Sequence, residues 1–185
     1  MCCGTERENT VSCPLDCPYL REARVREKER SLRPEDYPNS EVKIDESFLQ
    51  RNEALLIFVA SGLANSALSA ENAIDNDVKE ALASLITTYK TRQSGLVFES
   101  RPDNAIAARV QAGIQERIRE IEEALHRNDV SLRDSDVLGV LVFLQRLEMQ
   151  KNNGRARSRA FIDFLREFFP PPELAPEPET NLIVP

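Results

Sequence analysis

The feature that most constrains the fold of this chain is a ridge of apolar residues at helical spacing in the stretch from Pro102 to His126. Its members are Ile106, Val110, Ile114, Ile118, Ile121 and Leu125. Apolar residues that recur every three or four positions line one face of a helix, so this stretch predicts a long amphipathic helix. Pro102 is expected at its first position, because proline is tolerated in the first helical turn.

Similar spacing predicts four more helices. The first begins at Asp45, the second runs from about Asp75 to Val97, the third runs from about Ser135 to Asn152, and the fourth covers residues 155–169. Either Asp45 or its neighbour Ser47 is expected to cap the first of these. The chain has 185 residues, only six glycines and no tryptophan, which argues against sandwiches and barrels. We therefore expect an all-α fold, with a bundle of about five helices over residues 45–169.

The longest uncharged stretch, residues 54–70, has the sequence "ALLIFVASGLANSALSA". It is close to the shortest length that can span a membrane, but its second half is polar and it has no flanking aromatic or basic residues. We therefore expect no membrane span and a central, buried helix, in which small residues permit close helix packing. Residues 94–102, "SGLVFESRP", fit either a helix end or an extended segment.

All four cysteines, Cys2, Cys3, Cys13 and Cys17, lie in the first 17 residues. Four thiolates can close a tetrahedral zinc site or hold an iron–sulfur cluster, and we expect zinc as the cofactor with the cluster as the alternative. The spacing of the second pair is typical of zinc sites, whereas an adjacent pair is unusual. A redox dithiol and inert or disulfide-bonded cysteines remain open alternatives.

The cysteine segment also carries a resemblance. The stretch "CCGTER…SCPLDCPYL" resembles the amino terminus of a group of uncharacterised bacterial proteins, in which CCGT-x-R precedes CP-x-DC-x-YL. The resemblance implies that the four cysteines act as a unit, and it implies no particular activity. The letters "CCG" are also similar to part of the cluster-binding motif of heterodisulfide reductase subunits, in which the cysteines are much further apart.

The chain outside the bundle divides into three segments. We expect a cysteine-rich metal-binding segment over residues 1–20, a charged helix and linker over 21–44, and a disordered, acidic, proline-rich tail over 170–185. Residues 21–40 have too few apolar side chains to join the core. The first residues are polar rather than basic and then apolar, so no secretory signal is predicted. We therefore expect a cytoplasmic protein, whose compartment keeps thiols reduced.

The net charge of −7 makes nucleic acid an improbable partner, because binding phosphates requires clustered positive charge. One basic patch interrupts the acidic pattern; it consists of Lys151, Arg155, Arg157 and Arg159. A solvated loop is the favoured interpretation of this patch, and a phosphate site is the alternative.

Catalytic patterns are absent from the sequence. The chain has a single histidine, His126, and lacks the motifs of serine hydrolases, P-loop proteins and dinucleotide-binding proteins. His126 could also replace one cysteine as a zinc ligand. We expect a zinc-stabilised helical binding or adaptor protein without catalytic activity, with a protein partner or a second copy of itself. An iron–sulfur protein in electron transfer, sensing or an enzyme is the alternative, and a helical interaction protein with incidental cysteines is the third possibility.

Overall fold

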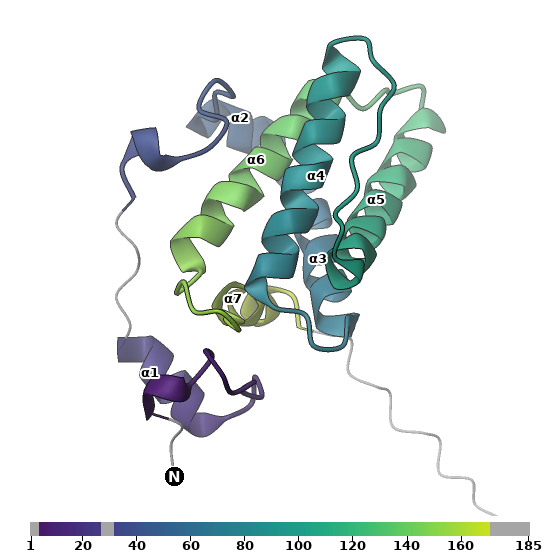
Figure 1. Cartoon of the computed structure of the whole chain (residues 1–185). Coiled ribbons are helices and arrows are strands. Elements are labelled where there is room, and N and C mark those ends of the chain that lie inside the picture. The colour runs from purple at the N-terminus through teal and green to yellow at the C-terminus, as the bar shows by residue number, and fades with distance from the viewer. Residues whose placement is uncertain (1–3, 27–31, 171–185) are drawn as a thin grey trace, which may run out of the picture.

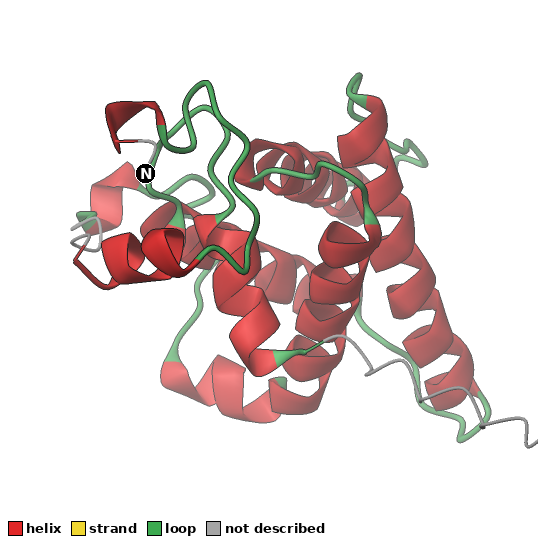
Figure 2. Cartoon of the chain, turned by 90° about the horizontal axis from the view of Figure 1, so that it is seen from below, coloured by secondary structure: helices red, strands yellow, loops and turns green. Residues whose placement is uncertain are grey.

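A computed structural model of the chain describes residues 4–26 and 32–170 (Figure 1). Within these two ranges the regular structure is helical throughout, with no strand, so the predicted all-α class is confirmed (Figure 2). The α-helices are α1 (Pro18–Arg26), α2 (Glu46–Arg51), α3 (Glu53–Ser69), α4 (Asp75–Gln93), α5 (Ala105–His126), α6 (Asp134–Lys151) and α7 (Ala160–Phe168). Two short 3-10 helices cover Gly4–Glu6 and Pro34–Asp36.

Four long helices surround the core. α3 packs against α5, α5 against α4, and α4 against α6, while α6 returns to α3. α7 lies across one end of these helices and contacts α3, α4 and α6 (Figure 1). The largest side chains that are fully buried in this core are Leu63, Leu82, Leu85, Ile114, Ile118, Leu141, Leu144, Phe161, Ile162 and Leu165.

α3 contains the uncharged stretch and is a central element, as predicted. Gly62, Ala64 and Ala67 are buried along it. At Gly113 of α5, a methyl group would lie 2.0 Å from the hydroxyl oxygen of Ser66 in α3, so only glycine permits this close approach. Among the helices of residues 4–26 and 32–170, none is long and apolar enough to cross a membrane.

The prediction of five helices over residues 45–169 is wrong by one, because the first predicted helix is divided. Asp45 caps α2, as predicted, by accepting a hydrogen bond of 2.7 Å from the backbone N–H of Phe48. The backbone of Asn52 then leaves helical geometry, with φ −109° and ψ 16°. α3 starts at the next residue, and a single residue therefore separates the two helices.

Two other helix boundaries differ from the predicted ones. α4 ends at Gln93 rather than Val97, because Gly95 takes φ +77° and residues 96–100 have no regular structure. α5 begins after Pro102, because the Asn104 side chain accepts a hydrogen bond of 2.8 Å from the backbone N–H of Ile106 and thereby fixes the first turn.

The end of the linker, beyond the residues 21–40 for which no core contact is expected, packs on the bundle. Val42 and Ile44 are partly buried against it. The guanidinium group of Arg146 in α6 donates hydrogen bonds to the backbone oxygens of Asn39 and Val42, at 2.9 and 3.0 Å. The linker is therefore held on α6, and the charged helix lies before it, at Pro18–Arg26.

Candidate functional site

Residues 4–26, here called the arm, lie beside α7 at one end of the bundle (Figures 1 and 2). The arm contains the second pair of cysteines and α1. It contacts α7 and the α6–α7 loop, residues 152–159, through hydrogen bonds and ion pairs. The cysteine segment is therefore attached to the bundle.

The turn from Cys13 to Cys17 is compact. Cys13 is buried, with its sulfur 3.8 Å from the backbone oxygen of Val11, and Cys17 is partly buried immediately before α1. The backbone N–H of Cys17 donates to the oxygen of Pro14 at 3.1 Å, and the Cys17 oxygen accepts from the first turn of α1. This arrangement fixes the backbone at Cys17 and keeps the Cys13 thiol in the interior.

Cys2 and Cys3 lie outside the described residues, so the structure places only half of the predicted ligand set. Within the described ranges, no group of three or more histidine, cysteine, aspartate or glutamate side chains could hold a metal ion. His126 is exposed at the last residue of α5, which Figure 1 shows at the opposite end of the bundle from α1. The structure therefore does not bring His126 to Cys13 and Cys17.

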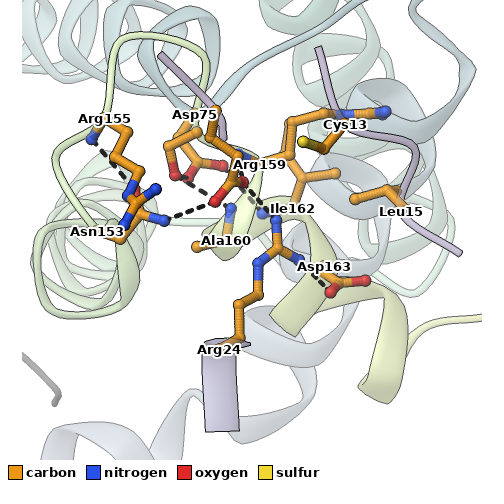
Figure 3. Close-up of polar contacts among 12 residues, drawn as sticks. Cys13, Leu15, Arg24, Asp75, Asn153, Arg155, Arg159, Ala160, Ile162 and Asp163 are labelled. Carbon is orange, nitrogen blue, oxygen red and sulfur yellow. Dashed lines mark hydrogen bonds and ion pairs between the residues drawn. The ribbon is translucent and has the colours of Figure 1, made fainter. Parts of the chain in front are cut away.

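Arg24 of α1 links the arm to α7. Its guanidinium group binds the Glu8 carboxylate at 2.6 Å and also the carboxylate of Asp163 in α7 (Figure 3). The Arg24 side chain is 13% exposed and that of Glu8 is 1% exposed. Since a buried charge is tolerated only when it is paired, the two carboxylates and the guanidinium depend on one another.

Hydrogen-bond donors of the α6–α7 loop surround the carboxylate of Glu8. Its carboxylate accepts hydrogen bonds from the Asn153 side chain at 2.9 Å and from the backbone N–H of Arg159 at 3.2 Å. Burial raises the pKa of this carboxyl group, but the hydrogen bond and charge of Arg24, with the donors of the loop, hold the pKa below its usual value near 4.5. Glu8 is therefore buried as an anion.

Arg166 of α7 makes a second attachment. It binds the carboxylate of Asp16 at 2.8 Å and the backbone oxygen of Leu15 at 3.3 Å. It also pairs with Asp163 one helical turn earlier, at 2.8 Å. Because residues 15 and 16 lie between Cys13 and Cys17, a side chain of the bundle directly holds the cysteine turn.

The basic patch is a contact surface for the arm. Arg155 donates to the backbone oxygen of Arg7 at 2.8 Å, and Arg157 donates to the hydroxyl of Ser12 at 2.7 Å. Lys151 lies over the ring of Phe164, 4.8 Å from its centroid. Residues 152–159 form a loop, as the favoured interpretation expects, and Arg157 is exposed, but the arginines of this loop also contact the arm.

Asp75 fixes the start of α7. It is fully buried, and its carboxylate accepts hydrogen bonds from the Ser158 hydroxyl at 2.6 Å and from the backbone N–H groups of Phe161 and Ile162 at 3.1 Å. Burial raises the pKa of Asp75 above its usual range. α7 consequently begins at Ala160, five residues later than predicted.

Sequence reasoning missed Glu8, Arg24, Asp163 and Arg166 as a cluster. Their partners are up to about 150 residues away along the chain, and an isolated charged residue carries no sign of its partner. The one local signal is the spacing of Asp163 and Arg166, which places both on the same face of α7.

A second surface feature lies between α4 and α5. Residues 97–99, in the loop that follows α4, border a groove of about 380 Å³ there. Three consecutive apolar residues, Leu96, Val97 and Phe98, are exposed beside it by 62%, 101% and 59%. The rim carries charges of both signs, from Arg92, Glu99, Glu116, Arg119 and Glu122.

No protein-family model, curated protein or solved structure matches this chain. The features that bear on function are therefore the cysteine turn, its attachment to α7, and the apolar segment beside the groove. Thiolates are soft metal ligands, and exposed apolar segments are typical of protein interfaces.

Proposed function

We propose that this chain is a zinc-stabilised helical binding protein without catalytic activity. The zinc site consists of the thiolates of Cys2, Cys3, Cys13 and Cys17, which match the ligand number of a structural zinc centre. The bundle presents the surface that binds a partner protein. The zinc site stabilises the arm, which contributes few apolar side chains of its own.

The observation that carries this proposal is the fixed turn from Cys13 to Cys17. The backbone bond from Cys17 to Pro14 and the contacts of Arg166 with Leu15 and Asp16 hold the turn in one conformation. A preformed pair of ligands loses less conformational entropy when a metal binds. A redox dithiol or incidental cysteines would require no such attachment.

As the partner we propose a second copy of this chain, bound through residues 96–98 and the groove between α4 and α5. A twofold interface brings the same surface of two copies together, so it must be complementary to itself. The groove rim satisfies this requirement, because arginine and glutamate side chains both line it. The exposed apolar side chains of Val97 and Phe98 would form the centre of the interface.

The test is elemental analysis with a visible spectrum, on protein purified without oxygen. About one zinc per chain and no visible absorbance support the proposal. Iron with sulfide and visible absorbance would replace it with the iron–sulfur alternative. Four reactive thiols without metal would show that the cysteines are not a metal site.

A further inference from the structure

We propose that the α6–α7 loop carries a carboxylate-binding site, which Glu8 of the arm fills in this structure and which a carboxylate from outside the chain can fill in its place. The two carboxylates would compete, so binding of the external one and docking of Glu8 exclude each other. Every group of this site lies within the described residues, and none of them is a proposed zinc ligand.

Three nitrogen donors converge on the carboxylate of Glu8 (Figure 3). The loop supplies two of them, the side-chain amide of Asn153 at 2.9 Å and the backbone N–H of Arg159 at 3.2 Å. Arg24 supplies the third, at 2.6 Å. Because the Glu8 side chain is buried, these donors replace the water that would otherwise surround it. Hydrogen bonds to a charged oxygen are stronger than those between neutral groups, so this set of donors is suited to a carboxylate.

The bundle holds the two loop donors in place without the help of the arm. The side-chain oxygen of Asn153 accepts a hydrogen bond of 3.1 Å from the backbone N–H of Arg155, which orients the amide nitrogen. The backbone N–H of Asp75 in α4 donates to the Ser158 oxygen at 2.8 Å, and the Asp75 carboxylate binds the Ser158 hydroxyl. The residue before Arg159 is thereby fixed to α4. A preformed site loses little conformational entropy when a ligand binds.

The loop around this site is positively charged. Residues 152–159 contain three arginines and no acidic residue. Arg157 binds the arm through the Ser12 hydroxyl, which is a neutral acceptor. The Nε atom of Arg159 is buried and has no hydrogen-bond partner among the described residues. Burial lowers the pKa of the Arg159 guanidinium, and repulsion from neighbouring arginines adds to this effect, against the attraction of Asp75. Loss of the Glu8 carboxylate would therefore leave a site that attracts another anion.

The test is rescue of the Glu8→Ala variant of the full chain by acetate. The substitution removes a CH2–COO⁻ group, and acetate has nearly the same size and the same charge. Hydrogen exchange of the arm is measured at neutral pH in about 200 mM sodium acetate and in the same concentration of sodium chloride. We expect acetate to slow exchange in the arm of Glu8→Ala about fivefold relative to chloride. Wild type should exchange equally in the two salts, because Glu8 fills its site.

Glu8→Gln is the matched control. Its amide fills the same space, so exchange in its arm should not differ between acetate and chloride. A double variant, Glu8→Ala with Asn153→Ala, removes one donor of the loop as well. Its affinity for acetate should be about tenfold lower than that of Glu8→Ala, because it lacks a hydrogen bond to a charged group.

The outcomes decide the proposal. Equal exchange of the Glu8→Ala arm in the two salts would overturn it. The same response to acetate in wild type, Glu8→Gln and Glu8→Ala would overturn it too, since acetate would then act on the whole protein rather than at this site. If Glu8→Ala is unfolded in chloride, acetate should restore its helical circular dichroism, and failure to do so would refute the site. None of these results bears on the zinc site, which elemental analysis tests separately.

Discussion

Arg24 in the arm and Asp163 in α7 form an ion pair between segments at opposite ends of the sequence, and the same guanidinium binds Glu8. This relationship makes the arm part of the folded domain. The cysteine turn is consequently held at a defined place beside α7.

The first prediction concerns Arg24. Arg24→Gln leaves Glu8 buried without its charged partner, so the free energy of unfolding should fall by about 3 kcal/mol. Urea unfolding followed by circular dichroism measures this change. Arg26→Gln, which breaks an exposed pair with Glu22 on the same helix, should leave stability unchanged. Equal effects of the two substitutions would contradict the structural role of Arg24.

The second prediction is the pH dependence that Glu8 causes. Its pKa is lower in the folded state than its usual value near 4.5, so its stabilising contribution is present above that pH and is lost as the pH falls through the folded pKa. Wild type should therefore be more stable than Glu8→Gln at pH 7, and the difference should shrink below pH 4.5. Thermal unfolding of both proteins from pH 7 to 3 measures it. A constant difference would show that Glu8 is not a buried anion.

The third prediction concerns the cap of α7. Asp75→Ala removes the acceptor of two backbone N–H groups and of the Ser158 hydroxyl, and it should lower the free energy of unfolding by about 2 kcal/mol. Asp45→Ala, at the exposed cap of α2, is the control and should have a smaller effect. If Asp75→Ala were as stable as wild type, Asp75 would not be the cap of α7.

The sequence predicts those features of the fold that depend on residues close together in the chain. Apolar periodicity places the long helices, and Asp45 caps α2 as its type and position suggest. The start of α7 could not be predicted, because it depends on Asp75, which comes from another helix. The contacts of the basic patch with the arm could not be predicted for the same reason: Arg155 and Arg157 bind residues that precede them by about 150 positions.

The fourth prediction concerns the proposed self-association. Replacement of Val97 and Phe98 together by serine should shift the chain from dimer to monomer, because it removes the apolar centre of the interface. Sedimentation velocity at several concentrations measures this shift. Val25→Ser, at an exposed apolar residue of α1, should leave association unchanged. A monomeric wild type would refute the proposed partner and leave the zinc site unaffected.

The most direct test of the zinc site is X-ray absorption at the zinc edge of the purified full chain. Four thiolate ligands predict a first shell of sulfur alone, at about 2.3 Å from the metal. A first shell that contains nitrogen or oxygen would show that the four cysteines do not form the site together. Absence of zinc from the protein would contradict the proposed zinc site.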